Sequence, residues 1–135
     1  MNGKIKTICL FILFSLVLSN PGASMEEHKD LPQEIFKHWV HSHEDDTKDI
    51  KVFRPVDYKF PPSRGREGFE FKKNGEFILY RIAPTDGSNK FFGHWKTGGK
   101  NKIIVSFETH DIGSYTITIV LCNKDILKIK KRNVR

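Results

Sequence analysis

The sequence predicts an all-β fold, in which about eight antiparallel strands form an up-and-down meander that closes into a small barrel, with a short N-terminal helix before it. Apolar and polar residues alternate through most of the chain after residue 37, which is typical of strands with one buried face. Turn residues interrupt this alternation at intervals of about 8–12 residues. Closure is expected because a single open sheet of this length would leave edges that invite aggregation.

The elements are expected in the following order. Residues 31–36 have helical spacing with a proline in the first turn, and residues 38–44 alternate as a first strand. Residues 50–54 form a second strand, which leads into an irregular stretch. Asn74-Gly75 is a strong hairpin signal after that stretch. The remaining strands are expected at residues 69–71, 77–82, 91–96, 103–107, 115–121 and 127–129.

The N-terminal residues have the pattern of an export signal. Lys4 and Lys6 give a positive start, residues 8–18 form an apolar run, and a small-residue cleavage site ends near Ser24. The run is shorter than the ~20 residues that span a bilayer, which favours a cleaved signal over the alternative, an uncleaved anchor. Cleavage would remove two lysines and lower the net charge from +7 to +5.

We therefore expect a signal peptide over residues 1–24, a flexible leader over 25–30 and a single barrel domain over 31–133. The protein is then periplasmic or extracellular. Cys122 is the only cysteine after the predicted cleavage site, so no internal disulfide is expected.

The most unusual segment is an irregular stretch at residues 54–68, here called the long loop. With its flanking residues 53–71 it holds three prolines, three arginines, two glycines and five aromatic residues. Connections longer than about 12–15 residues within compact domains are usually functional or disordered. The aromatic residues need burial, which favours a rigid, cationic loop with a function.

Parts of the sequence are similar to a known group of proteins. Trp39 followed by Glu44, the run at residues 60–66 and the turn at residues 83–86 resemble small, exported, largely uncharacterised bacterial lipocalin-like proteins of the calycin type. Lys37 stands where lipocalins proper carry the glycine of Gly-x-Trp. The resemblance covers most of the mature chain and implies a barrel with an apolar ligand, and not a known activity.

Candidate ligand-binding residues come from the long loop and the strand that follows it. Tyr58 and Phe60 would contact a ligand at the barrel mouth, and Arg64, Arg66 or Arg81 would hold an anionic group. The alternative is structural, with arginines that tie the loop to the barrel through backbone carbonyls or acidic side chains.

The histidines are weak candidates for a metal site. His41 and His43 would share one face of a strand, and His94 could complete the site if its strand lay nearby. Their spacing matches no established metal signature, so no metal or other cofactor is expected. No catalytic motif occurs, although a small lyase, isomerase or hydrolase that uses these histidines is the weakest alternative.

The favoured hypothesis is an exported, monomeric, non-catalytic protein that binds a small apolar or amphipathic ligand, including an anionic one, in its barrel. The alternative is an envelope-associated protein-interaction module with a filled barrel and no small-molecule ligand. Residues 127–135 are basic and could attract a membrane or acidic glycan, although a solvated strand face is the simpler interpretation. No nucleic-acid partner is expected.

Overall fold

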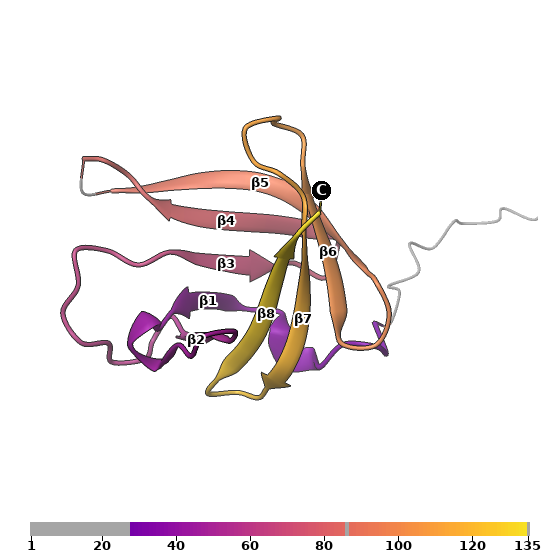
Figure 1. The fold of residues 1–135 in the computed structure, drawn as a ribbon, viewed down its shortest axis with the longest axis horizontal. Helices are drawn as coiled ribbons and strands as arrows, with labels where there is room; N and C mark the ends of the chain where they lie inside the picture. Colours follow the sequence, from indigo (N-terminus) through magenta and orange to yellow (C-terminus); the bar gives the residue numbers. More distant parts are fainter. Residues whose placement is uncertain (1–27, 86, 135) are drawn as a thin grey trace, which may run out of the picture.

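In the computed structural model, which describes residues 28–85 and 87–134, eight antiparallel strands close into a barrel (Figure 1). The strands are β1 (His38–His41), β2 (Lys51–Pro55), β3 (Gly68–Phe71), β4 (Glu76–Ile82), β5 (Ser88–Thr97), β6 (Lys102–Phe107), β7 (Tyr115–Cys122) and β8 (Leu127–Asn133). The predicted fold class is confirmed. The predicted signal peptide and residues 25–27 of the leader lie outside the described residues.

The order of strands around the barrel is β1-β2-β8-β7-β6-β5-β4-β3, so β1 lies between β2 and β3. Strands β3 to β8 form the predicted meander. Because β2 and β3 are both antiparallel to β1, the connection between them must carry the chain across β1. This connection is the long loop, of which residues 54, 55 and 68 belong to β2 and β3 and residues 56–67 lie between the strands, beside the β4–β5 hairpin at the left of Figure 1.

Two details near the N-terminus differ from the prediction. The expected helix is one 3₁₀ turn, η1 (Gln33–Ile35), which ends where Phe36 leaves the helical region with φ −80° and ψ 66°. Strand β1 ends at His41 rather than at residue 44, because a second 3₁₀ turn, η2 (His43–Asp45), follows. The Asp45 N–H donates to the Ser42 carbonyl at 3.0 Å, which closes this turn.

The interior of the barrel is packed with aromatic side chains. Trp39, Phe71 and Phe77 are almost entirely buried and belong to one continuous apolar cluster. The centroids of the Phe71 and Phe77 rings lie 5.0 Å apart, and that of Phe69 lies 5.2 Å from Phe71. Such distances are typical of aromatic pairs in direct contact. These rings therefore fill much of the space that a hollow barrel would offer to a ligand.

The N-terminal segment covers one end of the barrel, here called the closed end. Leu31 and Ile35 are buried within the apolar cluster. The Trp39 indole N–H donates to the Ile35 carbonyl at 3.1 Å, and the Asn101 N–H donates to the Asp30 carbonyl at 3.3 Å. These bonds hold the N-terminal segment against β1 and against the turn that precedes β6.

At the opposite end, here called the open end, the positions of inward parity include charged, polar and aromatic residues. The strand register places the pairs Arg81–Asn89, Gly93–Phe107 and Tyr115–Asn133 at this end. Strand β3 begins at the same end, where the His41 N–H donates to the Glu67 carbonyl at 2.8 Å. The end of the long loop and η2 therefore lie close to it.

Candidate binding site at the open end of the barrel

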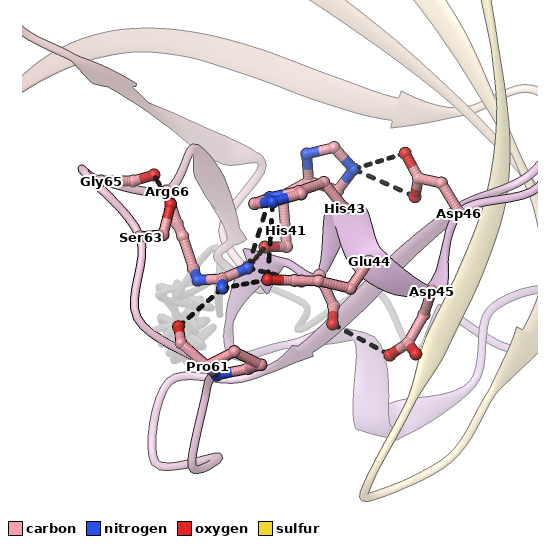
Figure 2. Close-up of polar contacts among 10 residues, drawn as sticks. His41, His43, Glu44, Asp45, Asp46, Pro61, Ser63, Gly65 and Arg66 are labelled. Atoms are coloured by element: carbon pink, nitrogen blue, oxygen red, sulfur yellow. Dashed lines mark hydrogen bonds and ion pairs between the residues drawn. The ribbon is translucent and has the colours of Figure 1, made fainter.

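Arg66 holds the long loop against the barrel. Figure 2 shows its guanidinium between the Pro61 carbonyl and the Glu44 carboxylate. It donates to the Pro61 carbonyl at 2.9 Å, to the His41 carbonyl at 3.2 Å and to both Glu44 oxygens, one of them at 2.8 Å. The side chain is only 8% exposed. Arg66 therefore joins the loop, β1 and η2, and both of its terminal amino groups donate to protein acceptors.

The Glu44 carboxyl group is strongly affected by this contact. The bond from Arg66, together with a backbone hydrogen bond, lowers the Glu44 pKa to about 2. The pair also lies beside an aromatic ring, because the Arg66 guanidinium carbon is 4.6 Å from the centroid of Phe60. Phe60 is thus partly covered by the same arginine that anchors the loop.

The acidic run, which consists of Glu44, Asp45 and Asp46, connects three segments of the chain. Asp45 pairs with Arg54 of β2 at 3.2 Å. Asp46 accepts from His41 at 2.9 Å, from Lys51 at 2.8 Å and from the Val52 N–H at 2.9 Å. Each acid therefore has its own cationic partners, and η2 is fastened to β1, β2 and the long loop.

The histidines do not converge on a metal site. His43 lies in η2, so it does not share a strand face with His41, and the two ring centroids are 6.2 Å apart. His94 pairs with Glu108 at 3.5 Å on an exposed part of β5. Within residues 28–85 and 87–134, no group of three or more His, Cys, Asp or Glu side chains could hold a metal ion.

Tyr58 and Phe60 lie together in the long loop, with ring centroids 4.9 Å apart. The Arg54 guanidinium covers Tyr58 at 4.9 Å, and Tyr58 is 41% exposed. The structure therefore places the two predicted aromatic contacts in one cluster outside the packed interior, where both rings face a guanidinium.

Arg64 lies at the exposed tip of the long loop, and no ion pair or hydrogen bond of its side chain occurs within the described part of the chain. The Ser63 hydroxyl donates to the Gly65 carbonyl at 3.0 Å, and Gly65 has a φ of 142°. A Cβ atom at Gly65 would meet the Ile82 side chain at 3.3 Å. The tip therefore approaches the end of β4, next to Arg81.

Two cations lie at positions of inward parity at the open end, where both are exposed to solvent. Arg81 has the same parity on β4 as the buried Phe77 and Leu79, and Lys131 has the same parity on β8 as the buried Ile129. The Arg81 guanidinium lies 5.7 Å from the ring centroid of Phe91. The Lys131 ammonium lies 3.9 Å from the ring centroid of Tyr115. Each cation thus rests on an aromatic ring.

Burial and neighbouring charges shift the pKa values of Lys131 and Tyr115 at the open end. Burial lowers the pKa of Lys131, the positive charge of Arg81 lowers it further, and Glu67 partly opposes both effects. Burial also raises the pKa of the Tyr115 hydroxyl, which keeps it neutral. Among the residues that the structure describes, no carboxylate lies within 4.0 Å of the charged groups of Arg81 or Lys131. This surplus of positive charge is suited to an anion.

Arg81 is among the candidate ligand-binding residues predicted from the sequence, whereas Lys131 is not. The signal was present, because Lys131 continues the alternation of Leu127 and Ile129, whereas Lys128 and Lys130 have the opposite parity. Lys131 was not singled out because it belongs to the basic run at residues 127–135, for which a solvated strand face was the simpler interpretation.

No family model matches the chain, and no curated protein or solved structure gives a significant match. None of the helices in the described ranges is long and apolar enough to cross a membrane.

Proposed function

We propose that this protein is an exported, non-catalytic, lipocalin-like binding protein that takes a small anionic amphipathic molecule at the open end of its barrel. The observation that carries this proposal is the pair of cations at positions of inward parity, Arg81 and Lys131, which rest on aromatic rings without a carboxylate partner among the described residues. The ligand would place its carboxylate or phosphate between them. No catalytic role is proposed for any residue.

Chemical complementarity supports an anionic group at this position. A guanidinium and an ammonium can donate charge-assisted hydrogen bonds, each of which contributes about 1.5–3 kcal/mol. An anion would also relieve the repulsion that helps to lower the Lys131 pKa. The rings of Phe91 and Tyr115 offer apolar surface to the rest of the ligand.

The packed interior limits how far a ligand can enter. Phe77 contacts Tyr115 and Phe107 with centroid distances of 6.3 and 5.8 Å, directly below the open end. We therefore place the ligand at the mouth, and not deep in the barrel as a hollow lipocalin would hold it. Gly65 at the tip of the long loop approaches Ile82 at the end of β4, so we name Arg64 as the candidate for a third cation and assign Arg66 a structural role.

Isothermal titration with decanoate tests the proposal, with decanol as an uncharged ligand of the same chain length. Decanoate should bind, and Arg81→Gln or Lys131→Gln should weaken it about tenfold, as expected for the loss of a charged hydrogen bond. Arg132→Gln is the matched control, because it removes the same charge from the adjacent, outward-facing position of β8. Equal binding of decanol, or an equal loss in Arg132→Gln, would contradict a site built on Arg81 and Lys131.

A second candidate function is a protein-interaction module without a small-molecule ligand. The packed aromatic interior favours it, because a filled barrel needs no ligand to complete its core. Under this alternative neither decanoate nor decanol binds, and a partner is recovered on the intact protein from its host.

The proposed export can be tested separately. Expression of the full chain in a Gram-negative host should give a periplasmic product whose intact mass begins at Met25. A product that retains residues 1–24 would support the uncleaved anchor instead.

A further inference from the structure

Outward-facing positions of β6, β7 and β8 carry a strongly positive surface, here called the basic face. Its cations are Lys102, Lys128, Lys130 and Arg132. These three strands contain no aspartate or glutamate, so no acidic residue on them neutralises these cations. Within the described residues, none of the four side chains forms an ion pair.

The strand register groups these cations. Lys102 of β6 is opposite Thr118 of β7, and Thr118 is opposite Lys130 of β8. Neighbouring strands lie about 4.8 Å apart, so the two lysines lie roughly 10 Å apart on one surface. Arg132 of β8 extends this group of cations, because it lies opposite Thr116 of β7. The result is a sheet surface of threonines flanked by cations.

The basic face also carries two exposed apolar side chains. A shift of register in β7 lies between Ile119 and Leu121, and Val120 at this bulge is 48% exposed. Leu121 is 43% exposed and lies opposite Lys128. A shallow groove of about 450 Å³ adjoins this pair and is lined in part by Leu31, Pro32 and Lys100. The apolar pair thus lies beside Lys128 and Lys100, with Asp30 as the one acidic residue that lines the groove among those described.

We propose that the basic face binds the surface of an anionic lipid bilayer, with Val120 and Leu121 at the level of the headgroups and the lysines on lipid phosphates. A lysine near an anionic bilayer contributes about fivefold to affinity, and the attraction decreases within a Debye length. This contact is independent of the open end, whose cations have the opposite, inward parity.

A bilayer fits these residues better than a nucleic acid does. Proteins that bind single strands stack bases on aromatic side chains, and the outward positions of β6–β8 carry none. The aromatic residues of these strands, Phe107 and Tyr115, belong to or pack against the core. Exposed valine and leucine among lysines instead match an interface that is both charged and apolar.

Flotation with lipid vesicles tests this proposal, with protein that begins at Met25 so that the apolar N-terminal run does not contribute. The barrel of residues 28–134 closes on itself, so this form is expected to keep its fold. Binding should require phosphatidylglycerol in phosphatidylcholine vesicles and should decrease steeply with added salt. Lys102→Gln with Lys130→Gln should reduce affinity about 25-fold, which is two successive fivefold losses.

The matched control is Lys59→Gln with Lys90→Gln, which removes the same charge from exposed positions on the long loop and on the part of β5 that pairs with β4. It should retain most of the binding. Val120→Ser with Leu121→Ser should reduce binding about fivefold or more without changing the salt dependence. Binding to heparin or DNA but not to vesicles, an equal loss in the control, or no binding to phosphatidylglycerol vesicles would overturn the proposal.

Discussion

Arg66 forms a two-pronged ion pair with Glu44, and this pair joins the long loop to the turn that follows β1. Because β1 lies between β2 and β3, the loop must cross it, and the ion pair is formed beside that crossing. The close approach of the backbones there requires a glycine at the end of the loop. A Cβ atom at Gly68 would lie 2.4 Å from the Trp39 carbonyl oxygen.

Arg66→Gln should lower the free energy of unfolding by about 1–3 kcal/mol. The substitution removes charge-assisted bonds to Glu44 and hydrogen bonds to the carbonyls of His41 and Pro61. Urea denaturation followed by tryptophan fluorescence measures the change. Arg64→Gln is the control, because this exposed arginine lies two residues away on the same loop, and its effect should remain within about 0.5 kcal/mol. Equal effects of the two substitutions would contradict the structural role of Arg66.

Stability should decrease as the pH is lowered from about 5 to about 2. The Glu44 pKa falls from 4.5 to about 2 in the folded protein, and the Asp46 pKa is lowered as well, with favourable bonds from Lys51, Val52 and His41. Carboxylates with lowered pKa stabilise the fold above their unfolded pKa, and this contribution is lost as the pH falls through the folded value. Thermal unfolding at a series of pH values measures this loss of stability. The Glu44→Gln variant should lose less stability than the unmodified protein over the same pH range. An unchanged slope in this variant would show that the pair does not contribute.

Lys131→Met should separate stability from binding. The ammonium is disfavoured where it lies, because burial and Arg81 lower its pKa, whereas the apolar part of the side chain covers Tyr115. An unbranched apolar replacement should keep that cover and raise the free energy of unfolding by up to about 1 kcal/mol, while decanoate binding decreases. Differential scanning calorimetry and titration on the same sample measure both quantities. A clear loss of stability would indicate that Lys131 supports the fold.

Phe77→Ala should lower the free energy of unfolding by about 3–5 kcal/mol, because its side chain is fully buried and contacts several rings. Phe92→Ala removes the same atoms from a side chain that is 66% exposed on the next strand, so its cost should be about 1 kcal/mol or less. Urea denaturation of both variants compares them. Similar costs would contradict an interior that is packed around Phe77.

The alternation of apolar residues was sufficient to predict the barrel, because side chains on successive strand positions point to opposite faces. The position of β1 between β2 and β3 was not predicted. Pairing between strands that are distant in sequence depends on which edges meet, and no local pattern records this. The sequence did indicate that residues 54–68 form a long irregular connection.

The candidate site was predicted in part. Arg81 was identified from its alternation with apolar residues, and the arginines of the loop were left with two interpretations. Their different environments depend on η2, which ends β1 early and brings Glu44 to Arg66 but not to Arg64. A turn of three residues has too weak a sequence signal to distinguish it from a continued strand. The same turn separates His41 from His43, on which the metal hypothesis depended.

If the open end binds an anion between Arg81 and Lys131, decanoate should perturb the residues around these two cations. A titration of ¹⁵N-labelled protein with decanoate, followed by amide chemical shifts, measures this. We predict saturable shifts concentrated at Arg81, Tyr115, Lys131 and the neighbouring Phe91, with decanol giving much smaller changes at the same amides. Shifts confined to the basic face or to the groove beside Leu121, with the amides of Arg81 and Lys131 unchanged, would contradict the claim.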